Sequence, residues 1–148
     1  MRIITVFITA LLLISQTIFS QPGTSWYLPD DVSYNTKIIT PGQFFGHQIG
    51  EWHLSHDKLY YYMQELARSS DRALWEEYAR SHEGRPLGHL IISSPENIRN
   101  LEKLRLEHIS LADPGLSSGV DIGRAPVFIK LGYGIHGNES SSQNASVL

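Results

Sequence analysis

The 148-residue chain contains no cysteine, and this absence removes several chemistries at once. Disulfide bonds, thiolate catalysis and cysteine-based zinc sites are excluded, so any metal site must use histidine and carboxylate ligands. Seven histidines and fifteen acidic residues are available for that role. The chain also lacks a cluster of Lys and Arg, and its net charge is −3. Because a nucleic-acid partner requires a concentrated basic face, we expect none here.

Long hydrophobic runs are scarce as well, and only the N-terminus has one, from Ile3 to Ile14. Arg2 precedes this run and the small residue Ser20 follows it, which is typical of a secretory signal peptide over residues 1–20. The alternative is an uncleaved anchor helix, which would have to include the polar residues 15–17. We expect cleavage, a secreted or periplasmic protein, and no membrane contact after cleavage.

The next segment, residues 21–54, is rich in proline and glycine, which predicts an irregular leader. Five aromatic residues stand in it: Trp26, Tyr27, Phe44, Phe45 and Trp52. These are too many for a free linker, so we expect the leader to pack on the domain that follows.

Residues 55–148 carry helix and strand signals. Four apolar residues recur at helical spacing after Ser55, a suitable N-cap: Leu59, Tyr62, Met63 and Leu66. Residues 73–78 fit a helix or a strand, and residues 87–93 predict a strand. Ser94 and Pro95 then predict the start of a helix that Asp113 and Pro114 end.

A nearly continuous apolar run extends from Val127 to Tyr133, which is typical of a strand buried on both faces of a sheet. A last helix is expected to begin near Ser140, and the chain stops within it without a stop signal. The predicted fold class is therefore α/β, with a mixed sheet that carries helices on both faces, incomplete at the C-terminus.

The strongest candidate site follows that run directly, because ligands gather at the carboxyl ends of strands in open α/β sheets. His136 and Glu139 are three residues apart, so their side chains can face one point in a turn. An imidazole nitrogen and a carboxylate oxygen suit Zn²⁺. The other interpretation is a polar turn in which Glu139 stabilises the N-terminus of a helix.

Two weaker patterns are interpreted structurally. His53, His56 and Asp57 form a second candidate ligand cluster, but they follow no strand, and a helix start explains them. Residues 115–119 spell the G-x-S-x-G nucleophile motif around Ser117. That motif needs a sharp strand-to-helix turn, whereas here we expect a loop between a helix and a strand.

Two blocks in the chain together resemble the zinc carboxypeptidase family, the carboxypeptidase A-like metallopeptidases. The first is EYARSHEGRPL, from Glu77 to Leu87, and the second is residues 126–139, which end in HGNE. The resemblance covers about residues 50–148. It implies that residues 55–148 are the N-terminal part of a catalytic domain and that residues 73–78 are a strand. Glu83 and Arg85 are interpreted as structural residues of a turn.

The resemblance implies that His136 and Glu139 are the first two zinc ligands of an exported metallocarboxypeptidase acting on peptide or protein C-termini. The third ligand and the general base of this family lie downstream, so we expect them beyond Leu148 and no catalytic residue within this chain. Asn138 stands where digestive members carry Arg. HGNE also occurs in amidohydrolases that act on acylated amino acids, so that activity is an alternative. A non-catalytic secreted binding module of the same fold is another.

Overall fold

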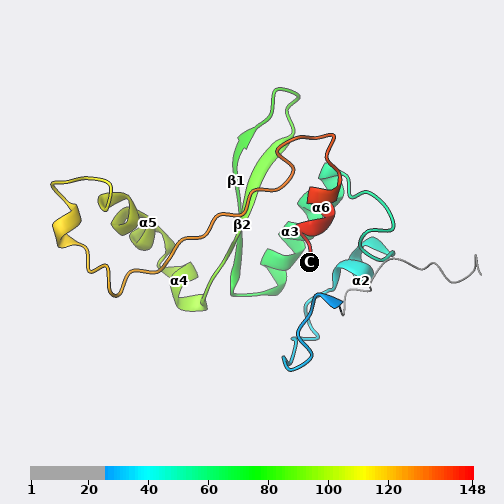
Figure 1. The fold of residues 1–148 in the computed structure, drawn as a ribbon, viewed down its shortest axis with the longest axis horizontal. Helices are drawn as coiled ribbons and strands as arrows, with labels where there is room; N and C mark the ends of the chain where they lie inside the picture. The colour runs from blue at the N-terminus through cyan, green and yellow to red at the C-terminus, as the bar shows by residue number, and fades with distance from the viewer. Residues whose placement is uncertain (1–25) are drawn as a thin grey trace, which may run out of the picture. The chain divides into compact units, whose positions relative to one another are not determined.

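A computed structural model describes residues 26–148 of the chain. These residues form helices and one two-stranded antiparallel sheet (Figure 1), so the chain has mixed α and β structure. The chain divides into two units, Met1–Val32 and Ser33–Leu148. Residues 26–32 of the first unit form turns, and every element named below belongs to the second. The predicted signal peptide, residues 1–20, lies outside the described residues.

The longest described helix is α3, His56–Ser69, which the apolar periodicity predicts. Ser55 precedes it with an extended backbone, as an N-cap residue does. Tyr62 is buried, and the other apolar side chains of the periodic set pack beside it: Leu59, Met63 and Leu66. One apolar side of α3 therefore attaches the helix to the rest of the unit.

The core of the second unit joins segments that lie far apart in the sequence. Its buried apolar members are Leu54, Tyr62 and Val147. Helix α2, Pro41–Phe45, adds Phe44 and Phe45, whose rings each lie 5.1 Å from the ring of Tyr62. Aromatic pairs at this separation stabilise a core beyond the area that they bury. The core thus forms between the segment before α3, α3 itself and the C-terminal residues.

The aromatic residues of the expected leader differ in burial. Phe44 and Phe45 pack against the core cluster, whereas Trp52 is 68% exposed, with its ring 5.2 Å from that of His47. Trp26 and Tyr27 belong to the first unit and are exposed. Aromatic content indicates that some burial occurs, but it does not specify which rings are buried.

Strands β1, Ala73–Arg80, and β2, Pro86–Ile92, form an antiparallel hairpin. The strand interpretation of residues 73–78 is therefore right and the helical one is wrong. The register shifts between Glu77 and Ala79, which leaves a bulge in β1. Helix α3 packs against both strands and lies alongside them in Figure 1.

The helix predicted after β2 begins where expected but is interrupted. Helix α4, Pro95–Arg99, starts with the Ser94 hydroxyl accepting a backbone N–H, and α5, Leu101–Ser110, follows after Asn100. The amide of Asn100 donates to the carbonyl of Glu96 at 3.0 Å. The break lies at Asn100 itself, whose backbone angles, φ −103° and ψ 15°, fall outside the helical range.

Two short elements complete the described chain. The first is the 3₁₀ turn η3, Ser117–Gly119, in the loop that follows α5. The second is helix α6, Ser141–Ala145, which begins next to the predicted position Ser140. Among residues 26–148, none of the helices combines the length and the apolar character that a membrane crossing requires.

The apolar run from Val127 to Tyr133 differs from its prediction. Instead of a strand buried on both faces, it has no strand partner among the described residues and is largely exposed. The exposed fraction is 86% at Val127 and 80% at Ile129. A strand exists only through hydrogen bonds to a neighbour, and here β1 and β2 pair with each other. Apolar composition alone therefore did not specify a partner for this run.

Candidate functional site

The predicted metal pair lies in a tight turn that leads into α6. Gly134 begins the turn with φ 67°, a conformation that side chains disfavour. The backbone N–H of Glu139 donates to the carbonyl of His136 at 3.0 Å, which closes the chain between the two residues. Both side chains therefore project from one short turn.

The side chains of this pair meet. His136 Nδ1 lies 3.0 Å from Glu139 Oε1, as expected from the three-residue spacing. The side chains are 71% and 66% exposed, respectively, so solvent reaches both. An ion pair at such exposure contributes little to stability. The contact therefore adds little to the stability of the fold.

These two atoms are in direct contact, slightly closer together than two ligands of one metal ion. Two ligand atoms that lie about 2.1 Å from a tetrahedral zinc are about 3.4 Å apart, so a slight opening of the contact admits the ion. A catalytic zinc takes three protein ligands, however. In residues 26–148, no group of three or more histidine, aspartate or glutamate side chains is placed to hold a metal. The described structure thus brings together only the two candidate ligands, His136 and Glu139.

The turn is attached to the core through α6. The amide of Asn144 donates to the backbone carbonyl of Trp52 at 3.1 Å, and Val147 is only 9% exposed within the core cluster. The Ser142 hydroxyl accepts the N–H of Gly134 at 3.0 Å. No sequence pattern marks Ser142 or Val147, because their partners are distant along the chain or are backbone atoms.

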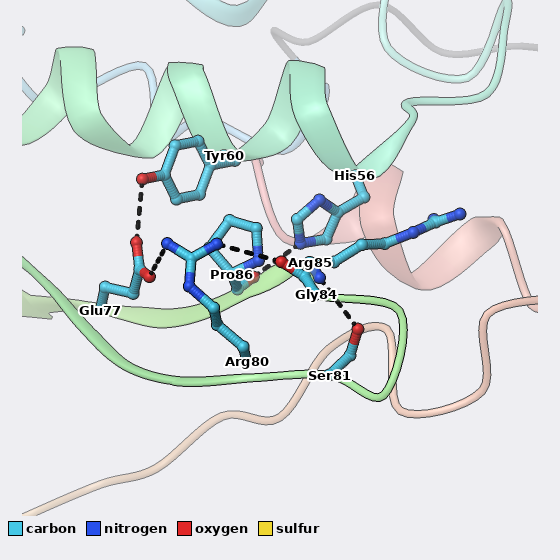
Figure 2. A network of polar contacts seen from close by, with 8 residues as sticks. All are labelled: His56, Tyr60, Glu77, Arg80, Ser81, Gly84, Arg85 and Pro86. Atoms are coloured by element: carbon cyan, nitrogen blue, oxygen red, sulfur yellow. Dashed lines mark hydrogen bonds and ion pairs between the residues drawn. The ribbon is translucent and has the colours of Figure 1, made fainter.

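The second candidate ligand cluster serves the packing of α3 on the hairpin. Figure 2 shows His56 directed at the hairpin, where its Nε2 donates to the carbonyl of Pro86 at 2.9 Å. In the same view the Tyr60 hydroxyl donates to Glu77 at 3.2 Å. The Ser55 hydroxyl and nearby backbone N–H groups lower the pKa of Asp57, as befits a carboxylate in a first helical turn. The structural interpretation of His56 and Asp57 agrees with these contacts, and His53 lies before the helix.

The EGRP turn between β1 and β2 is closed by its own polar contacts. The N–H of Ser81 donates to the carbonyl of Arg85 at 2.8 Å, and Arg80 donates to the carbonyl of Gly84 at 3.0 Å (Figure 2). Arg85 Nε lies 3.1 Å from an oxygen of Glu83, and both side chains are exposed. Glu83 and Arg85 thus contact each other within the turn, as expected of structural turn residues.

The G-x-S-x-G match lies in an irregular loop. Ser117 begins η3, and the preceding helix α5 ends at Ser110, so no strand leads into the motif. The strained strand-to-helix turn that exposes a nucleophilic serine is therefore missing at this position.

Comparison with protein family models, with curated proteins and with solved structures finds no match for this chain.

Proposed function

We propose that this chain carries the first two zinc ligands, His136 and Glu139, of an exported zinc metallocarboxypeptidase. The observation that supports the proposal is the 3.0 Å approach of an imidazole nitrogen to a carboxylate oxygen on one exposed turn. The resemblance of residues 77–87 and 126–139 to the zinc carboxypeptidases adds the reaction class.

Each residue of the pair has a definite task in the proposed site. A bound zinc supplies a Lewis acid that polarises a scissile carbonyl and lowers the pKa of a water molecule. His136 offers a neutral nitrogen as a ligand and Glu139 offers a carboxylate, whose negative charge offsets part of the charge of the cation. The turn that begins at Gly134 holds these two groups toward one point.

The test is zinc binding to the full chain, measured by competition with a chromophoric chelator. His136→Ala and Glu139→Ala should each weaken binding at least tenfold, because each removes one of two ligands. The matched control is His89→Ala, since His89 Nε2 also lies 3.2 Å from a carboxylate oxygen, that of Glu76, on the hairpin. Unchanged zinc affinity in both site variants, or an equal loss in His89→Ala, would contradict the proposal.

The proposal also predicts the peptidase activity of the chain. With only two zinc ligands, the 148-residue chain should cleave no C-terminal residue from a peptide. Turnover that a chelator abolishes would show that the chain supplies more zinc ligands than the two that we assign. Reading the coding sequence past Leu148 separates the alternatives. A downstream histidine and glutamate favour a hydrolase, whereas a stop codon favours a non-catalytic module.

A zinc amidohydrolase acting on acylated amino acids is the second candidate. It rests on Asn138, an exposed residue between the two ligands, at which the digestive carboxypeptidases carry Arg. A protein that extends beyond Leu148 would distinguish the two by its relative turnover of a C-terminal peptide and an N-acyl amino acid.

Export is proposed on residues 1–20 alone. Mass spectrometry of the processed protein should find an N-terminus at Gln21 or within one or two residues of it, because a small residue, Ser20, ends the apolar segment. Retention of Met1 in the exported product would contradict cleavage.

A further inference from the structure

One hydroxyl group joins the two ends of the turn that carries the metal pair. The Ser142 hydroxyl accepts the N–H of Gly134, which precedes His136, and donates to the carbonyl of Glu139, with both distances 3.0 Å. The two contacts use one lone pair and the single proton of the hydroxyl. The side-chain amide of Gln143 lies 3.2 Å from the same oxygen and, with its NH₂ group turned toward it, donates to the second lone pair, so the three contacts are compatible. The segments on either side of His136 are thereby held to one atom.

The helix that carries this hydroxyl is itself held at its far end. Helix α6 has five residues, too few to be stable by its own hydrogen bonds. Asn144 bonds to the backbone of Trp52, and Val147 is buried with Leu54 and Tyr62. Ser142 is therefore connected to the core through the residues that follow it.

The geometry points to Ser142 as a positioning residue for the metal pair, a role that rests on the proposed function. His136 and Glu139 are exposed, and within residues 26–148 their side chains are oriented by their own contact and by this turn. If the turn loosens, the two ligands must be ordered when the metal binds, and affinity falls by that cost. Groups that orient metal ligands typically change metal affinity by ten- to a hundredfold. Because Ser142 contacts the backbone of the turn and not the ligand side chains, we expect its loss to lower zinc affinity about tenfold, the lower end of that range.

The experiment compares two variants of equal shape in the full chain. Ser142→Thr keeps the hydroxyl and Ser142→Val lacks it, so both have the same cost of a branched side chain in a helix. The zinc dissociation constant is measured by chelator competition, and the imidazole ¹⁵N resonances of His136 are followed during the titration. We expect Ser142→Val to bind about tenfold more weakly and Ser142→Thr to bind within twofold of the parent. Ser141→Ala, at an exposed position of the same helix, should leave affinity unchanged.

Two further measurements make the outcome decisive. Near-ultraviolet circular dichroism of each variant without metal reports on the aromatic core, and a purely structural role would alter it together with affinity. An altered core signal in Ser142→Val, or equal affinity in the Val and Thr variants, would overturn the positioning role. Should His136→Ala bind zinc as the parent does, the proposed function fails instead, whatever Ser142 does. The two failures are thus distinguishable.

Discussion

Gly88 of β2 lies beneath the indole ring of Trp75 of β1, and the ring leaves no room for a side chain there. A Cβ atom built on Gly88 would lie 2.6 Å from Cη2 of Trp75, closer still to Cζ2, and 2.9 Å from the carbonyl oxygen of Glu76. Trp75 in turn meets the ring of Tyr60 edge to face, with centroids 5.3 Å apart. The small residue in β2 therefore permits the contact between the hairpin and α3.

Replacing Gly88 by alanine should destabilise the chain. The added methyl group must displace Trp75 from Tyr60, and overpacking of this kind costs about 1–3 kcal/mol in the free energy of unfolding. Urea unfolding followed by circular dichroism measures the loss. Gly119→Ala is the control, because a Cβ there meets no atom within 4 Å, and we expect a change within about 0.5 kcal/mol. Equal stability of the two variants would contradict the close packing of Trp75 on Gly88.

Tyr62 should make stability depend on alkaline pH. Burial raises the pKa of its phenol to about 12, and its hydroxyl donates to the carbonyl of Ile39 at 3.2 Å. The unfolded chain releases this proton near pH 10, whereas the folded chain retains it, so the unfolded state binds fewer protons between these values. The contribution of Tyr62 is therefore complete below about pH 10 and is lost as the pH rises toward 12.

The measurement is the urea midpoint as a function of pH from 8 to 11.5. Tyr62→Phe keeps the ring in the core but cannot ionise, so its midpoint should fall less steeply above pH 10 than that of the parent. At pH 8 the variant should be less stable by about 1 kcal/mol, because the carbonyl of Ile39 loses its partner. Parallel pH profiles for the two proteins would show that Tyr62 titrates normally in the folded state.

Local patterns were sufficient where the residues that decide a structure are neighbours in the sequence. Ser55 and the apolar spacing after it predicted α3, and Ser94 with Pro95 predicted the start of α4. The spacing of His136 and Glu139 likewise predicted that their side chains can meet, because three residues of a turn determine that distance. In each case the information lies within a few residues.

Patterns failed where a distant partner decides. The run from Val127 to Tyr133 has the composition of a buried strand, yet no composition specifies which chain segment will pair with it. Val147 was expected only as part of a helix start, and its burial depends on Leu54 and Tyr62, more than eighty residues earlier. The contact between His136 and Glu139 can be predicted from the sequence, whereas the attachment of their turn to Ser142 and the core depends on tertiary structure.

Ser117 should be chemically inert despite its G-x-S-x-G setting. It lies in η3 within a loop, and in the described part of the chain no histidine bonds to its hydroxyl as the base of a serine nucleophile would. A serine-directed fluorophosphonate should therefore leave the full chain unlabelled, as shown by intact-protein mass spectrometry. Ser117→Ala provides the control, and labelling of the parent but not of this variant would revive the serine mechanism.

Val147 and Ile129 allow a matched test of which apolar residues stabilise the fold. Val147 lies near the end of the chain but is 9% exposed in the core, whereas Ile129, eighteen residues earlier, is 80% exposed. Burial rather than position in the sequence should decide the outcome. Val147→Ala removes two buried methyl groups and should lower the free energy of unfolding by about 1–3 kcal/mol. Ile129→Ala should change it by less than about 0.5 kcal/mol.

The same two variants also test whether the core supports the proposed metal pair, His136 and Glu139. Because Val147 helps to anchor α6, Val147→Ala should weaken zinc binding together with stability, while Ile129→Ala should leave both unchanged. Urea unfolding and chelator competition on the same samples give the two values. A large loss of stability in Ile129→Ala would mean that the apolar run is packed in solution, and the exposed arrangement of residues 127–133 would then be wrong. A destabilised Val147→Ala with full zinc affinity would instead show that the turn holds its shape without the core.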